Sequence, residues 1–230
     1  MKLLAVSVLL LILVPPLSGV EPGGVTVEGI IVYTGPLPKP VPVPEAQCER
    51  HLIERDAKTN GLRDAVVWIE GMKAPARKPP RKAVMDQRAF AFVPHVLAIE
   101  AGQEVEFLNS DGANHGVLAS SSEPRNAFNL VTPPAGSRTH RFVSCRGPVR
   151  LGCPIHASMA AWIFVFDHPF FAVTDAQGKF RLPPLPPGKY RLEVRHPTGE
   201  MRRTRELIVE AGKPTALRIE LVRKDAQEKR

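Results

Sequence analysis

Proline is the feature that most restricts the fold of this chain. The 230 residues include 24 prolines, and proline breaks helices because it lacks a backbone N–H and fixes φ. A helical bundle is therefore disfavoured, and short strands joined by Pro/Gly turns are expected instead. Hydrophobic residues make up 43% of the chain and charged residues 23%, which is typical of a globular protein and not of a disordered one.

The first residues have the pattern of a secretory signal peptide. Lys2 is followed by an apolar run from Leu4 to Val14, and residues 15–19 end that run with prolines and small residues. We therefore expect residues 1–19 to be removed, although a retained anchor is the alternative. Since no second apolar run of this length occurs, we expect no integral membrane span after cleavage. The mature chain should be secreted or periplasmic, in a compartment that permits disulfides.

The charge of the chain limits the partners that it is expected to bind. The formal net charge is +8, but aromatic residues make up only 6% and no basic-aromatic motif is visible. An acidic protein partner or an anionic surface is therefore expected, and nucleic acid is not. The basic run at residues 202–205 is interpreted first as a solvated strand face and second as a docking patch.

Alternating apolar residues predict an all-β chain in two units. The sequence pattern changes at about His168, which we take as the boundary between them. Residues 20–167 form the larger unit, whose strands point to a sandwich or barrel. Residues 168–224 form a smaller all-β unit, which we expect to pack on the first. Residues 225–230 form a charged tail, and residues 36–60 and 74–82 are expected to be loops. The strands expected in the larger unit are at residues 25–33, 64–70, 90–100, 104–109, 116–120, 138–144, 149–153 and 161–167.

One segment carries a cluster of possible metal ligands. Cys153, His156 and Met159 place a thiol, an imidazole and a thioether within seven residues. Period-two counting from Val149 through Leu151 points Cys153 inward at the end of a strand. His156 and Met159 lie on the turn that follows and can fold back toward the same point.

A second histidine would complete a known copper geometry. Two histidines and one cysteine, with a weak axial methionine, form a blue-copper site, and His115 on the loop after a strand is the best candidate. The plainer interpretation is a buried thiol beside unrelated loop residues. Zinc would accept the same cysteine and histidines but gains little from Met159. The chain has seven histidines and no His-x-His pair, so the additional coppers of an oxidase are not expected.

The ligand segments resemble the cupredoxin family, which includes plastocyanin and azurin. The resemblance rests on Phe107-x-Asn109-x-Asp111-x3-His115 followed by Cys153-x2-His156-x2-Met159, and it covers residues 24–167. It implies an eight-stranded Greek-key sandwich with one type 1 copper held by His115, Cys153, His156 and Met159. It also implies a non-enzymatic electron carrier with a redox protein partner, and His156 as the electron port.

The smaller unit resembles the carboxypeptidase-regulatory-like (transthyretin-like) module. The resemblance rests on Thr174-Asp175-x2-Gly178-x-Phe180 and Leu185-Pro186-Pro187-Gly188-x-Tyr190, and it implies a small β-sandwich. The whole layout, including Asp86-Gln87 and Phe92-x-Pro94-His95-Val96, is similar to secreted bacterial cupredoxin proteins of the methylamine-utilisation type.

Several points stay open at the level of the sequence. Gly116 stands where many cupredoxins carry asparagine, which removes a tether between the ligand loops and is expected to loosen the site. Cys48 and Cys145 could form a disulfide or remain free thiols. One alternative function is a cell-surface or periplasmic binding module in which copper is structural or absent. Another is copper delivery or storage.

Overall fold

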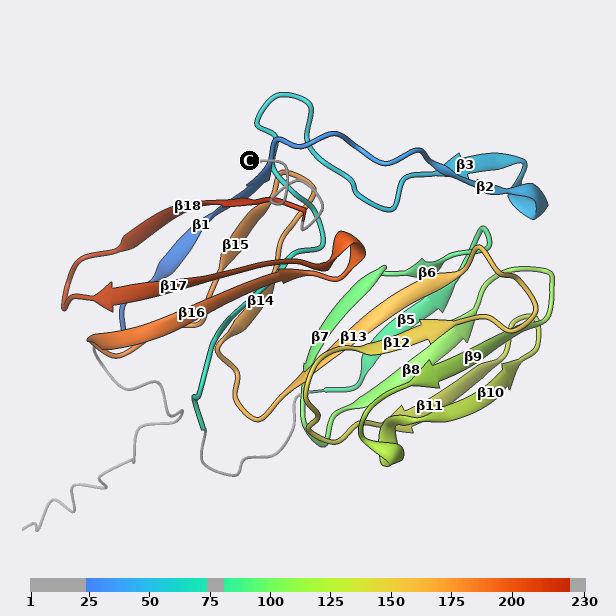
Figure 1. Cartoon of the computed structure of the whole chain (residues 1–230). Coiled ribbons are helices and arrows are strands. Elements are labelled where there is room, and N and C mark those ends of the chain that lie inside the picture. The colour runs from blue at the N-terminus through green and yellow to red at the C-terminus, as the bar shows by residue number, and fades with distance from the viewer. Residues whose placement is uncertain (1–23, 74–80, 224–230) are drawn as a thin grey trace, which may run out of the picture.

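Two β-sandwiches make up the part of the chain that the computed structural model describes, residues 24–73 and 81–223 (Figure 1). The predicted signal peptide at residues 1–19 and the tail at residues 225–230 lie outside the described residues, as does most of the expected loop at residues 74–82. The described elements are strands and three single-turn 3-10 helices, Pro44–Ala46, Pro124–Asn126 and Thr198–Glu200. The all-β class predicted from the alternating apolar residues is confirmed.

The first sandwich consists of a five-stranded and a four-stranded sheet. In spatial order the larger sheet contains β10 (Phe128–Thr132), β9 (His115–Ser120), β12 (Val149–Gly152), β13 (Ala160–Phe166) and β7 (Val96–Glu100). The smaller sheet contains β11 (Ser137–Arg141), β8 (Glu104–Asn109), β5 (Ala83–Gln87) and β6 (Phe92–Val93). Alternating side chains such as Val105 and Phe107 of β8 are fully buried between the two sheets, as expected for strands with one face on a core.

The second sandwich has a four-stranded and a three-stranded sheet. The four-stranded sheet contains β14 (Phe171–Val173), β4 (Val66–Ile69), β16 (Gly188–His196) and β17 (Met201–Val209). The three-stranded sheet contains β15 (Lys179–Arg181), β1 (Val27–Tyr33) and β18 (Thr215–Leu221). The two sheets share one apolar core that includes Ile31, Val67 and Leu192.

The predicted boundary of the first unit, residues 20–167, is wrong at its N-terminal end. Strand β1 pairs in parallel with β18 along its whole length, and β4 pairs with both β14 and β16. Both early strands therefore belong to the second sandwich, and the first sandwich is inserted between β4 and β14. The apolar pattern of a sequence indicates that a strand exists but not which strand it pairs with. The assignment of β1 and β4 to the second sandwich could therefore not be predicted.

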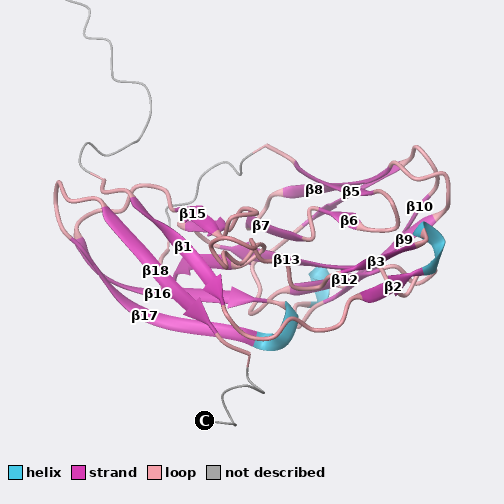
Figure 2. Ribbon diagram, turned by 90° about the horizontal axis from the view of Figure 1, so that it is seen from above, coloured by secondary structure: helices cyan, strands magenta, loops and turns pink. Residues whose placement is uncertain are grey.

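A third apolar cluster joins the two sandwiches, which lie side by side in Figure 2. Strand β13 explains why, because both of its faces are covered. Its residues Ala161, Ile163 and Val165 enter the core of the first sandwich. The alternate residues, Trp162, Phe164 and Phe166, pack toward β4 and β14. The most apolar segment after the N-terminal run is therefore a strand with packing on both faces, although Trp162 and Phe166 are only half-buried.

A β-hairpin extends from the second sandwich to the first (Figure 1). It consists of β2 (Val41–Val43) and β3 (Cys48–Arg50), joined by the first 3-10 turn, in a region expected to be only loop. The Arg50 guanidinium donates hydrogen bonds to the carbonyl oxygens of Phe90 at 2.9 Å and Ala89 at 3.1 Å. We call residues 34–60 the arm.

Two strand predictions differ from the structure within the first sandwich. The segment expected as one strand over residues 90–100 is divided at Pro94 into β6 and β7, which belong to different sheets. Proline cannot donate to a ladder, so it favours such a break. Strands β5 and β10 were not predicted, because polar residues such as Asp86, Gln87 and Asn129 interrupt their apolar pattern.

Candidate metal centre

The first sandwich brings His115, Cys153 and His156 together at one end. His115 is the first residue of β9, Cys153 directly follows β12, and His156 lies on the turn from β12 to β13. Strands β9 and β12 are neighbours, with Leu118 opposite Gly152, so residues far apart in the sequence end at the same edge. One ligand atom from each of the three residues lies within 4.8 Å of the others.

The distances in this cluster suit a single bound metal ion. The Nδ1 atoms of His115 and His156 are 3.0 Å apart, and Cys153 Sγ is 3.6 Å from His156 Nδ1. A first-row metal lies about 2.0 Å from an imidazole nitrogen and about 2.3 Å from a thiolate sulfur, so donors that share one ion are about 3 to 4 Å apart. His115 is fully buried and Cys153 is 7% exposed. The set fits a borderline-soft ion such as copper or zinc.

The turn that carries the ligands is closed by its own backbone. The N–H of Met159 donates to the carbonyl oxygen of His156 at 3.1 Å, and the N–H of Cys153 donates to that of Met159 at 3.3 Å. Met159 is 2% exposed and belongs to the same core cluster as Cys153. The structure thus places Met159 in the ligand turn and buried, and its axial role stays a prediction.

Asp111 orients the imidazole of His115. The Oδ2 atom of Asp111 is 2.8 Å from His115 Nε2, which leaves Nδ1 facing the cluster. Burial alone would raise the pKa of the Asp111 carboxyl, but hydrogen bonds from the Phe90 N–H, from His115 and from the Ala89 N–H bring it below its usual value. Asp111 therefore remains an anion and fixes which ring nitrogen is available to a metal.

The expectation that Gly116 loosens the site does not fit the packing around it. A Cβ placed on Gly116 would lie 2.8 Å from Pro154 Cδ, so a larger residue has no space there. Gly116 also contacts a candidate ligand directly, since its N–H donates to Cys153 Sγ at 3.4 Å. Buried Asn109 braces the loop before His115, because its Nδ2 donates to the carbonyl oxygens of Ala113 at 2.8 Å and Thr132 at 2.7 Å.

An aromatic ring from a neighbouring loop covers both imidazoles. The Phe90 ring packs edge-on against His115 and His156, with centroid distances of 5.4 Å and 5.0 Å. Ala89 and Phe90 have φ of 52° and 53°, values that are uncommon for residues with a side chain. Hydrogen bonds hold this loop from two sides, since Asp111 accepts from both N–H groups and Arg50 of the arm donates to both carbonyls.

Sequence reasoning did not single out Asp111, Phe90 or Arg50 as parts of the site. A signal existed for Asp111, because a carboxylate four residues before a proposed histidine ligand is within reach of its ring. Nothing in the sequence indicates that Phe90 or Arg50 approaches the ligands, since both contacts depend on how distant segments pack.

The remaining histidines and cysteines lie away from this cluster. Within the described residues, His115, Cys153 and His156 are the one group of three such donors that could hold a metal. Cys48 and Cys145, whose pairing was left open, are both free thiols. No helix among the described residues has the length and apolar character needed to cross a membrane.

A comparison with protein families agrees with the second of the expected units. Residues 162–222 match the family model of the carboxypeptidase regulatory-like domain, close to the predicted range of 168–224. No curated protein is detectably similar to the chain.

Several solved structures that are similar to the chain are copper proteins. The copper-containing nitrite reductase of Thermus scotoductus is 20% identical, with a TM-score of 0.35, and the match covers 60% of this chain but only 28% of that enzyme. A purple cupredoxin of Nitrosopumilus maritimus is 19% identical, with a TM-score of 0.32, and the match covers 36% of this chain and 99% of the other. Amicyanin of Paracoccus versutus is 17% identical, with a TM-score of 0.33 and coverage of 44% and 97%. Since these scores are low, the site is assigned from the chain's own residues.

Proposed function

We propose that this protein is an exported mononuclear copper protein that carries single electrons. The observation that carries the proposal is the convergence of His115 Nδ1, His156 Nδ1 and Cys153 Sγ, at spacings that one ion can bridge. A thiolate suits Cu(I) and imidazoles suit both oxidation states, so this donor set favours copper over harder metals. The copper supplies the one-electron couple when it is bound.

The residues around the ligands support a site that changes little during electron transfer. The core strands, the hydrogen bonds of Asn109 and Asp111, and the Gly116 N–H on the sulfur hold the three donors in place. A rigid donor set favours rapid exchange, because little atomic movement accompanies the change of charge. The carboxylate of Asp111 adds electron density to His115 and should favour the oxidised state.

The surface next to the ligands supports contact with a protein partner. His156 is half-buried, and it is the ligand that we assign as the electron port. Its neighbour Ile155 is 55% exposed, and Leu118 and Val131, which pair with Gly152 and Gly116 of the ligand strands, are 42% and 60% exposed. Apolar side chains around a port permit close approach, and the net charge of +8 favours an acidic redox partner.

The test is the optical and EPR spectrum of the full chain loaded with Cu(II). A thiolate-to-copper charge-transfer band at about 600 nm, the wavelength that the cupredoxin resemblance implies, is expected. Cys153→Ser should abolish the band, whereas Cys145→Ser should preserve it, because Cys145 lies outside the cluster. A colourless Cu(II)-loaded protein with Cys153 reduced would refute the proposal.

Electron exchange separates this proposal from copper delivery or storage. An electron carrier should be reduced and reoxidised quickly by small redox reagents while it retains its copper. Slow exchange together with ready transfer of Cu(I) to an acceptor chelator would instead favour delivery.

A further inference from the structure

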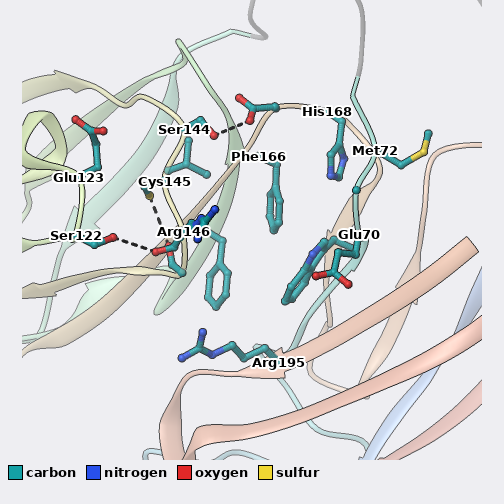
Figure 3. A pocket seen from close by; sticks show the side chains of 16 residues that line it. Glu70, Met72, Ser122, Glu123, Ser144, Cys145, Arg146, Phe166, His168 and Arg195 are labelled. Atoms are coloured by element: carbon teal, nitrogen blue, oxygen red, sulfur yellow. Dashed lines mark hydrogen bonds between the residues drawn. The ribbon is translucent and has the colours of Figure 1, made fainter.

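A large cleft lies between the two sandwiches and has no role in the copper site (Figure 3). Its volume is about 1040 Å³, slightly above the range typical of small-molecule sites, about 300 to 1,000 Å³. Both sandwiches contribute to its lining. Trp68, Glu70 and Arg195 come from the second sandwich or the residues next to it, and Phe166 and Arg146 come from the first.

Aromatic rings form one wall of the cleft. Trp68 and Phe166 are half-buried, and their ring centroids are 5.5 Å apart. Phe164, also in the lining, lies 6.3 Å from Trp68 between centroids. Rings that are only partly covered by protein offer flat apolar surface to a ligand. The cleft can therefore hold a flat or cyclic group.

The carboxylates of the lining already have partners. Glu70 is paired with Arg191 at 2.8 Å, and Glu123 with Arg125 at 2.7 Å. Asp167 accepts a hydrogen bond from Ser144 Oγ at 2.7 Å. Glu70 and Glu123 are thus neutralised by arginines that do not line the cleft.

Two arginines of the lining remain without such partners. Among the residues that the structure describes, neither Arg146 nor Arg195 forms an ion pair. Figure 3 shows them entering the cleft from opposite sandwiches, and Arg195 Nη1 lies 3.8 Å from the position a Cβ would take on Gly147. Burial lowers the pKa of His168 and raises that of the Cys145 thiol, so both stay uncharged near neutral pH. Among the described residues, the lining therefore has two guanidinium groups without an ion-pair partner and one carboxylate, Asp167, whose hydrogen-bond partner is an uncharged hydroxyl, so positive charge prevails.

We propose that this cleft binds a small aromatic carboxylate or sulfonate. The ring of the ligand lies against Trp68 and Phe166, and its acid group accepts hydrogen bonds from Arg146 and Arg195. A guanidinium matches a planar acid group with two parallel N–H donors. Because each sandwich supplies one arginine and part of the aromatic wall, the ligand contacts both units at once. This inference is independent of copper.

Isothermal titration of the full chain with 2-naphthoate tests the proposal. 2-Naphthylmethylamine has the same ring with a positive charge, and cyclohexanecarboxylate has the acid without an aromatic ring. We expect 2-naphthoate to bind about tenfold or more tightly than the amine, because the amine cannot accept hydrogen bonds from the two arginines. We also expect it to bind more tightly than cyclohexanecarboxylate, because that acid has no aromatic ring to lie against Trp68 and Phe166. Equal binding of the amine or the cyclohexane acid would overturn the proposal.

Substitutions locate the binding in the cleft. Arg146→Gln combined with Arg195→Gln should weaken 2-naphthoate binding about tenfold or more. Arg218→Gln is the matched control, because Arg218 is exposed on β18 and does not line the cleft, so binding should be unchanged. Far-UV circular dichroism verifies that each variant is folded. Undiminished binding by the folded double variant would refute the assignment of the two arginines.

Discussion

His196 should make the stability of the protein depend on pH. This histidine ends β16 and is 1% exposed, with its Nδ1 3.0 Å from the carbonyl oxygen of Thr198. The charges of Asp64 and His95 act on it in opposite directions, and both effects are smaller than that of burial. Burial lowers the pKa of His196 from 6.5 to about 4, because the imidazolium would lose its hydration inside the protein. The folded chain therefore keeps His196 neutral at pH values at which the unfolded chain protonates it.

The sign and size of the effect follow from this difference. Above the unfolded pKa of about 6.5, both states are neutral and the group adds no pH dependence. As the pH falls toward 4, the unfolded state gains the proton first, and the free energy of unfolding decreases. Each pKa unit is equivalent to about 1.4 kcal/mol, so we expect a loss of about 2 kcal/mol between about pH 7.5 and about pH 5, and about 3 kcal/mol in total.

Urea unfolding of wild type and His196→Gln measures this loss. The difference in unfolding free energy between the two proteins should shrink by about 2 kcal/mol from about pH 7.5 to about pH 5, because glutamine does not titrate. His51→Gln is the control, since His51 is exposed and its difference from wild type should stay nearly constant. A wild-type-minus-His196→Gln difference that is the same at both pH values would show that burial does not suppress protonation.

Two further predictions concern the hydrogen bonds that brace the site and the core. Asp111→Asn should weaken copper binding by about tenfold, because His115 loses its anionic partner. Asp175→Asn, at a turn of the second sandwich where the carboxylate also accepts backbone N–H groups, should leave binding unchanged in a competition with a chelator. If both variants bind copper equally, the carboxylate has no role at the metal. Thr174→Val should lower the unfolding free energy by about 1 to 3 kcal/mol, because buried Thr174 bonds the Leu62 carbonyl and the Ala65 N–H. Thr174→Ser should retain most of that stability in urea unfolding, and equal losses in the two variants would point to packing instead.

The ligand turn could be predicted because its information is local. Cys153, His156 and Met159 lie within seven residues, and the alternation of β12 places the cysteine on the inner face. His115 was added as a histidine on the loop after a strand that could complete the donor set, and the structure makes it the first residue of β9. Asp111 acts over a similarly short distance, but its partner is clear only once the ring orientation of His115 is known.

The pairing of the early strands and the path of the arm could not be predicted. The pattern of β1 is equally compatible with either sandwich, and its register with β18 joins residues near opposite ends of the sequence. Likewise, the bonds from Arg50 to the Phe90 loop follow from tertiary packing. The smaller unit predicted at residues 168–224 lacks two of its strands for the same reason, because β1 and β4 complete a core that the later strands would leave open.

The insertion of the first sandwich into the second limits how the two can move. A module joined through a single linker can swivel about it, but this one enters after β4 and returns at β14, so both of its chain ends are attached to the same body. Rotation of one sandwich against the other would displace both connections between them. It would also separate the aromatic side chains that pack between the two sandwiches. A molecule that binds the second sandwich therefore also fixes the direction in which the cysteine-histidine end of the first sandwich faces.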